Sequence, residues 1–270
     1  MFEVVDQQSE PVEEVATSDL LAVVAGMGLT RISRHLEERE QRRCTRLFHL
    51  MTSPALPAID EVLRLFDLSA EGAKQYGPAA LPDLIHRGRR DFEDMLDGLL
   101  VGAHPPMANA ARDVMELEWL LRDIVRDPGQ LEVWANADEK TRRREFSPIA
   151  MRKRLAQVAH PGLDLPETPE YQVHSASLHV TPGREEIDER FENDPGPGVV
   201  FFWVHEILEH TRRLFVPMDQ LLRIYSSGQW ASAATDRFRL GWAFCAQVVN
   251  DHKAELPPGA LPERVPRPRR

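Results

Sequence analysis

Two charged residues one helical turn apart stand in the middle of an apolar segment. Arg112 and Glu116 lie within residues 107–127, MANAARDVMELEWLLRDIVRD, which contain neither Gly nor Pro. Residues four apart share a helix face, so the guanidinium and the carboxylate can form an ion pair. An exposed pair contributes about 0.3–0.5 kcal/mol, whereas a buried pair costs several kcal/mol per ion unless other hydrogen bonds complete it. The exposed pair is the ordinary interpretation, and a buried pair would mark a functional cluster.

A second polar set follows about sixty residues later. Tyr171, Ser175 and His179 are spaced four residues apart, which places them along one face of a helix. A phenol, a hydroxyl and an imidazole together offer proton donors and an acceptor near neutral pH. Pro182 and Gly183 follow His179, so we expect the imidazole at a helix C-terminus, where positive charge is favoured. The alternative is a helix that packs Tyr171 inward and satisfies the other two side chains locally.

The third candidate is the sequence HEILEH, formed in part by His205, Glu206, Glu209 and His210. It differs from the zinc motif HExxH, because its histidines are five residues apart and point about 140° away from each other. Glu206 and His210 share a helix face and would suit a carboxylate-rich metal site. The sequence offers no evident partner helix, so the solvated face of an amphipathic helix is the preferred interpretation. We therefore predict neither a metal nor a cofactor.

An arginine followed six positions later by a histidine occurs twice, at Arg43 and His49 and at Arg154 and His160. Ribonucleases of the HEPN class, which are small helical domains, carry an Arg-x4–6-His motif that acts without a metal. Neither copy here has the polar residue usual after the arginine. In a chain this rich in arginine the spacing arises by chance, and it carries little weight.

Helices must position all of these residues. Pro105 and Pro106 precede the segment 107–127 and Pro128 follows it, as expected at helix ends. At about 100° per residue, one face of this helix is apolar and is predicted to enter the core: Met107, Ala111, Val114, Leu117, Leu121 and Val125. Met115, Trp119 and Leu120 flank the charged face, so we expect the helix to be covered nearly all round.

The chain as a whole predicts an all-α fold, a multi-helix bundle of about nine or ten helices, because no alternating strand and no repeat is found. The expected divisions are an acidic flexible arm, an N-terminal helical region, a helical core domain and a Pro/Arg-rich tail: residues 1–16, 17–80, 81–252 and 253–270. The arm and the tail are expected to be disordered. Within the helical parts we expect a short helix at 58–68, a loop at 69–80, a helix at 199–215 that Pro217 kinks or ends, and a last helix at 230–249.

Composition limits the classes of function. The formal net charge of -10 argues against a general nucleic-acid-binding surface. Cys44 and Cys245 have no metal-binding spacing and suggest free thiols in a reducing compartment. The N-terminus lacks a basic segment and no apolar run is long enough to cross a bilayer. We therefore expect a cytoplasmic protein that does not enter the membrane.

The order of these motifs is similar to that of a known group of proteins. Arg112 and Glu116 form R-x3-E, helices with a Trp follow, and Tyr171, Ser175, His179 and Pro182 form Y-x3-S-x3-H-x2-P. This pattern, over residues 80–250, resembles a bacterial all-helical family of unknown function, some members of which are compared with abortive-infection and HEPN-like proteins. The resemblance implies that Arg112, Glu116, Tyr171, Ser175 and His179 form one polar cluster.

Three hypotheses about function follow. The first is a bacterial stress- or phage-defence protein, a metal-independent HEPN-like ribonuclease with RNA as a partner, in which His179 transfers the proton and Arg112 binds the phosphate. The second is a non-enzymatic interaction module that binds another copy or another protein, with the same residues fixing helix register. The third is a metal protein that binds through Glu206 and His210.

Overall fold

The computed structural model describes residues 17–159, 165–176, 196–230 and 236–251. Within these ranges every regular element is a helix, so the all-α prediction is confirmed. The predicted arm, the whole predicted tail and His179 lie outside the described residues. The helices are α1 (Thr17–Gly26), α2 (Thr30–Met51), α3 (Ala55–Tyr76), α4 (Ala80–Val101), α5 (His104–Arg126), α6 (Gln130–Asn136), α7 (Glu139–Glu145), α8 (Pro148–Ala159), α9 (Thr168–Ala176), α11 (Pro197–Tyr225) and α12 (Asp236–Asp251).

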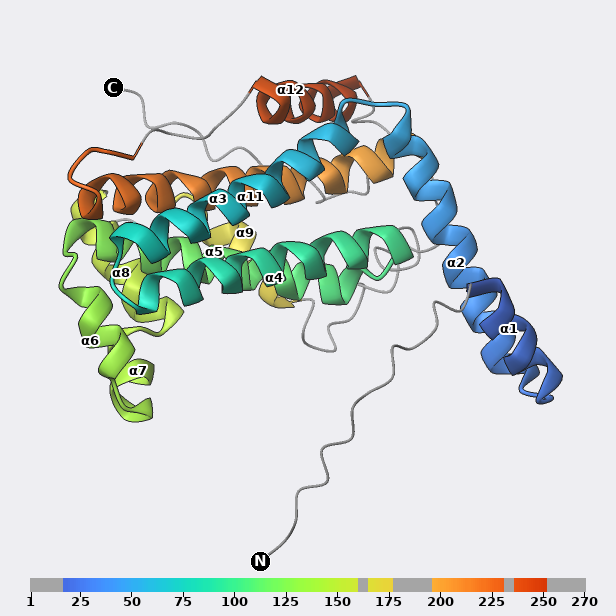
Figure 1. The fold of residues 1–270 in the computed structure, drawn as a ribbon, viewed down its shortest axis with the longest axis horizontal. Helices are drawn as coiled ribbons and strands as arrows, with labels where there is room; N and C mark the ends of the chain where they lie inside the picture. Colours follow the sequence, from blue (N-terminus) through green and yellow to red (C-terminus); the bar gives the residue numbers. More distant parts are fainter. Residues whose placement is uncertain (1–16, 160–164, 177–195, 231–235, 252–270) are drawn as a thin grey trace, which may run out of the picture.

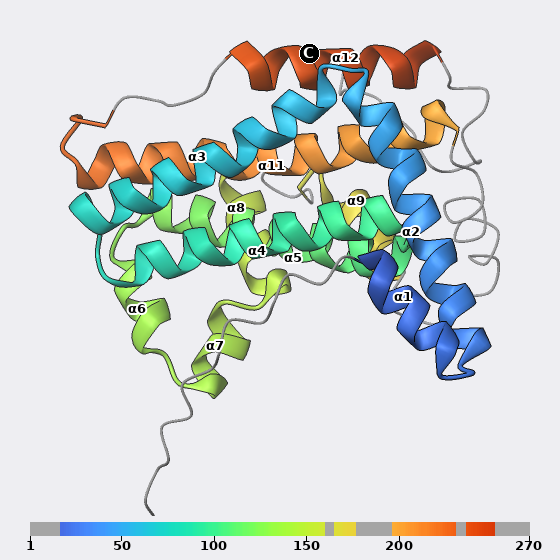
Figure 2. The ribbon, with the colours of Figure 1, turned by 45° about the vertical axis from the view of Figure 1, so that its right-hand side comes forward.

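Four long helices form the body of the bundle. Helices α3, α4, α5 and α11 run alongside one another, and α12 lies over α3 and α11 (Figure 1). Helix α2 leaves this body at one end, with α1 folded back on it, while α6 and α7 project at the other end (Figure 2). The smaller helices α8 and α9 pack against α5. None of the described helices is both long and apolar enough to cross a bilayer.

Helix α5 is the central helix that the sequence predicts. Its apolar face is buried, with the Val114 side chain 1% exposed and Leu121 fully covered. The opposite side is covered as well, since Trp119 has no exposed surface. The end of α4 makes the sharp turn into α5 through Gly102, whose positive φ of 72° favours glycine. The expectation that α5 is enclosed nearly all round is therefore confirmed.

Helix α3 is longer than predicted. The sequence predicts a loop for residues 69–80, and this prediction is wrong for residues 69–76, because α3 continues through Gly72 to Tyr76. A Cβ atom at Gly72 would lie 2.5 Å from the indole ring of Trp230. The glycine therefore allows a close approach between α3 and a distant segment, and it does not break the helix.

The C-terminal helices also differ from the expected bounds. Helix α11 is continuous through Pro217, which removes one backbone hydrogen bond but is itself buried in the core. Trp230, the predicted first residue of the last helix, is not helical, and α12 is described from Asp236, after residues that lie outside the described ranges. The short helix α7, capped by Asp138, has no counterpart in the prediction.

Candidate metal centre

Two glutamate–histidine pairs with identical spacing face each other between α9 and α11. Glu170 and His174 lie one turn apart on α9, and Glu206 and His210 lie one turn apart on α11. Residues four apart project from the same side of a helix, so each pair presents a carboxylate and an imidazole together. One ligand atom from each of the four residues lies within 4.8 Å of the other three. Two helices thus bring four metal-ligand side chains to a single point.

The distances among these atoms match the dimensions of a metal site. The Nε2 atoms of His174 and His210 are 3.1 Å apart, and His210 Nε2 lies 3.6 Å from Glu170 Oε1 and 3.8 Å from Glu206 Oε2. Metal–ligand bonds of about 2.0–2.1 Å in tetrahedral geometry place neighbouring ligand atoms about 3.3 Å apart. The three distances from His210 Nε2 are within about 0.5 Å of this value, and the remaining pairs, which lie within 4.8 Å, would have to close by up to about 1.5 Å.

Burial divides the site into an inner and an outer side. The side chains of His174 and His210 are 5% and 1% exposed, whereas those of Glu170 and Glu206 are 19% and 18% exposed. Burial, with a smaller contribution from His210, lowers the pKa of His174 to about 3. Burial also lowers the pKa of His210 well below its ordinary value. Both imidazoles are therefore neutral near pH 7, which is the form that binds metal ions.

Burial works against negative charge on the carboxyl groups at and beside the site. Burial, and then repulsion by Glu170, raises the pKa of Glu206 to about 8. Beside the site, Glu118 on α5 is 2% exposed, and burial raises its pKa to about 7. The guanidinium of Arg213, 15% exposed, bonds to Glu170 at 2.7 Å and lies 3.5 Å from Glu118. Glu118 and Glu170 thus share the well-buried Arg213, and a cation bound beside Glu206 would favour the ionised form of that carboxyl group.

Arg213 also fixes the protonation of His210. Its Nη2 atom lies 2.7 Å from His210 Nδ1, and a guanidinium can only donate, so Nδ1 must accept. The neutral ring then carries its proton on Nε2 and donates it to His174 Nε2. A metal ion at His210 Nε2 would have to replace this proton, so the ring would carry its proton on Nδ1 and Arg213 would have to leave that atom. Metal binding would therefore be coupled to the position of Arg213.

The residues predicted from α5 and α9 are partly brought together. The hydroxyl of Tyr171 donates to Glu116 at 2.8 Å, and Arg112 Nε lies 3.5 Å from the same carboxylate. The side chains of Arg112 and Glu116 are 23% and 22% exposed, between the two interpretations offered by the sequence. Burial, and then the bond to Glu116, raises the pKa of Tyr171 to about 12, so this phenol stays protonated. Ser175 is half-buried one turn after Tyr171, and His179 lies outside the described residues.

Other predicted features take different positions. The preferred interpretation of HEILEH as a solvated face is wrong for His210, because α9 supplies the partner helix that the sequence did not reveal. His205 and Glu209 lie beside Trp242 instead, and Glu209 accepts a hydrogen bond from its indole. Arg154 of α8 bonds to Asp123 of α5 at 2.5 Å, so it joins two helices. His160 lies outside the described residues. Cys44 and Cys245 are free thiols, as expected.

Sequence reasoning missed Glu170 and His174 by one position. It selected Tyr171 and Ser175 on the same helix, which face α5, whereas Glu170 and His174 are directed towards α11. A usable signal was present, because E-x3-H occurs at both places, as EYQVH and EILEH. A search for a second copy of the Glu206–His210 spacing would have found the pair.

Comparison of the chain with protein-family models, curated proteins and solved structures finds no match. The interpretation of the site therefore depends on its own geometry and chemistry.

Proposed function

We propose that this chain is a metal-binding protein that holds one divalent transition-metal ion through Glu170, His174, Glu206 and His210. The observation that carries the proposal is the convergence of four ligand atoms within 4.8 Å of one another, with both imidazoles neutral. Two nitrogen and two carboxylate ligands suit Zn²⁺, Fe²⁺ or Mn²⁺, and the imidazoles disfavour Ca²⁺ and Mg²⁺.

The orientation of the site suggests how it would be used. The histidines are enclosed, and the carboxylates form the more exposed side. An ion with more than four coordination positions would have its remaining positions on the carboxylate side, where water or a small substrate can bind. Arg213, which lies against Glu118, would then orient Glu170, as groups behind the ligands do in metal sites.

Metal content tests this proposal. The full chain is purified without chelator and analysed for metals, then stripped and titrated with Zn²⁺, Fe²⁺ and Mn²⁺ by calorimetry. We expect one ion per chain. His174→Gln should weaken binding by at least about 100-fold, since loss of a group that only supports a ligand already costs about 10- to 100-fold. The matched control is His86→Gln, an exposed histidine on α4. Absence of bound metal in the purified chain together with no saturable binding, or equal binding by His174→Gln, would contradict the proposal.

The second candidate is the HEPN-like, defence-related ribonuclease. Its support is the contact of Tyr171 with Glu116, which joins the two motifs that the resemblance places in one cluster. The chain is incubated with RNA in the presence of a chelator, beside His179→Ala and Tyr171→Phe. Cleavage by the wild type that is lost in His179→Ala would support this function. Equal cleavage by all three proteins, or none by the wild type, would exclude it, and neither result affects the metal proposal.

A further inference from the structure

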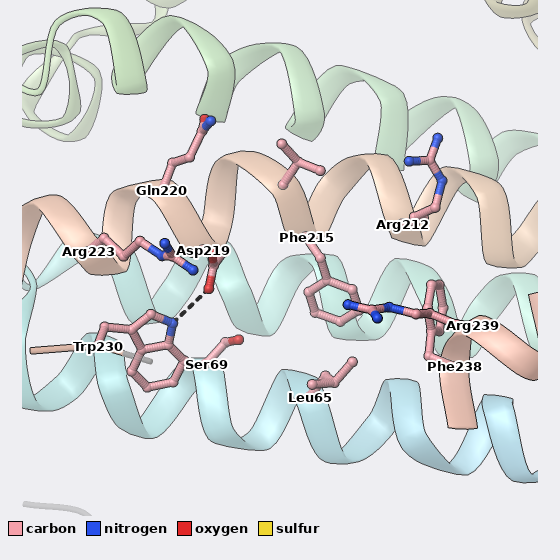
Figure 3. Close-up of a pocket in the computed structure, with 11 residues that line it drawn as sticks. Leu65, Ser69, Arg212, Phe215, Asp219, Gln220, Arg223, Trp230, Phe238 and Arg239 are labelled. Atoms are coloured by element: carbon pink, nitrogen blue, oxygen red, sulfur yellow. Dashed lines mark hydrogen bonds and ion pairs between the residues drawn. The ribbon is translucent and has the colours of Figure 1, made fainter. Parts of the chain in front are cut away.

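A cavity away from the metal centre lies between α3, α11, Trp230 and the start of α12. Its volume is about 410 Å3, within the roughly 300–1,000 Å3 typical of small-molecule sites. Figure 3 shows Leu65 and Ser69 of α3 along one side and residues of α11 along the other. The walls are mainly apolar and partly aromatic: Leu65, Phe215, Val216, Trp230 and Phe238. None of the four residues of the metal centre lines it.

The walls of this cavity are held in place by close contacts. The indole of Trp230 donates to Asp219 at 3.0 Å (Figure 3). The ring of Trp230 also lies against Gly72. Helix α12 is seated equally closely, because a Cβ atom at Gly241 would lie 2.7 Å from the carbonyl oxygen of Pro54. Trp230 is thus held against Gly72 of α3, and α12 is held through Gly241 against Pro54, which precedes α3. A cavity held in this way is preformed, so a ligand does not have to open it.

The charged groups of the cavity leave positive charge available. Arg212, Arg223 and Arg239 line it, against Asp219 as the one acidic lining residue. Arg212 is paired with Glu209 at 2.6 Å, outside the lining. Asp219 is already engaged by Trp230 and by Arg223, which lies 3.0 Å away. Arg239 has a weak partner, since Asp236 is 3.7 Å away and both side chains are well exposed, at 72% and 91%. An exposed pair of this kind contributes little, so the Arg239 guanidinium can turn to a ligand.

We propose that this cavity binds a small aromatic organic anion, a carboxylate or sulfonate, with its ring against Trp230 and Phe215 and its acidic group at Arg239. Aromatic walls favour a planar ligand through offset or edge contacts. Guanidinium recognises a carboxylate or a sulfonate by two parallel hydrogen bonds, which gives both affinity and orientation. This site is independent of the metal centre, and neither proposal depends on the other.

Fluorescent probes of matched shape test the proposal with the full chain. The anionic probe is 8-anilinonaphthalene-1-sulfonate, and N-phenyl-1-naphthylamine is its neutral counterpart. We expect saturable binding of the anionic probe to the native protein, with displacement by 1-naphthoate but not by 1-naphthylmethanol at the same concentration. Equal displacement by both compounds would overturn the anion preference, and no saturable binding would overturn the proposal.

Paired variants locate the binding. Val216→Trp fills the cavity from a half-exposed position on α11, and Ile224→Trp is its control, at an exposed position on the same helix that does not line the cavity. Arg239→Gln removes the proposed anion contact, and Arg237→Gln is its control on an exposed position of α12. We expect Val216→Trp to abolish probe binding, and Arg239→Gln to weaken the anionic probe by about tenfold, equivalent to one charge-assisted contact, while leaving the neutral probe unchanged. Wild-type affinity in Val216→Trp, or equal effects of Arg239→Gln and Arg237→Gln, would refute the assignment.

Discussion

The Nε2 atoms of His174 and His210 lie 3.1 Å apart, although 36 residues separate them in the chain. Two imidazoles at this distance share one proton, and two protonated rings would repel each other inside the core. The separation is also close to the edge of a tetrahedral metal site, about 3.3 Å. The contact that holds a proton in the metal-free protein would therefore hold an ion in the proposed metal-bound state.

Arg213→Met should strongly destabilise the protein after a chelator has removed any bound metal. The substitution leaves Glu118 and Glu170 without their shared cation, and breaking a buried ion pair costs about 3–5 kcal/mol. Urea unfolding followed by circular dichroism measures the loss, and Zn²⁺ should restore part of it by supplying positive charge beside Glu170. The control is Arg212→Met, whose exposed pair with Glu209 is worth about 1 kcal/mol or less. Equal losses in the two variants would show that the Arg213 contacts do not stabilise the fold.

Glu206→Gln should change how the stability of the metal-free protein depends on pH. The pKa of Glu206 is raised from its ordinary value of 4.5 to about 8, so between these values the folded chain keeps a proton that the unfolded chain loses. The free energy of unfolding of the wild type therefore falls as pH rises through this window. The variant has no carboxyl group at this position and lacks this pH dependence. The variant should gain stability relative to the wild type between about pH 5 and 8. Parallel pH profiles of the two melting temperatures would contradict the raised pKa.

Tyr171→Phe should cost about 1.5–3 kcal/mol, the usual worth of a hydrogen bond to a charged group. The reason is the 2.8 Å bond to Glu116, which is half-buried and depends on the phenol. Tyr225→Phe is the matched control, because its hydroxyl makes a longer bond of 3.3 Å to the Pro128 carbonyl, worth about 0.5–1 kcal/mol. Chemical denaturation of both variants gives the comparison, and a smaller loss for Tyr171→Phe than for Tyr225→Phe would contradict it.

Gly72→Ala should destabilise the protein, although alanine is the better helix former by about 0.5–1 kcal/mol. The added Cβ would lie 2.5 Å from the Trp230 ring, and overpacking of this kind costs about 1–3 kcal/mol. Gly26→Ala in α1 has nothing within 4 Å of the new atom and should be neutral or slightly stabilising. Thermal melts distinguish the two, and a stabilised Gly72→Ala would show that the contact with Trp230 is easily relieved.

The sequence by itself determined the class of structure and much of the helix pattern. The period of apolar residues in 107–127 predicted a central helix with a buried face, and the structure confirms it down to Val114 and Leu121. It also predicted free cysteines and the absence of strands from the regular elements, both confirmed in the described ranges. These features depend on local periodicity and composition, which can be determined from one segment without knowing what packs against it.

The tertiary structure alone decided which polar residues meet. The spacing of four placed Tyr171 and Ser175 on one face and Glu170 and His174 on the next, but spacing cannot show which face is directed towards α11. That choice depends on how α9 lies between α5 and α11, which is set by side-chain contacts between segments far apart in the chain. For the same reason Gly72 suggested a loop from the sequence, whereas the indole of Trp230, more than 150 positions later, explains why glycine stands within a helix.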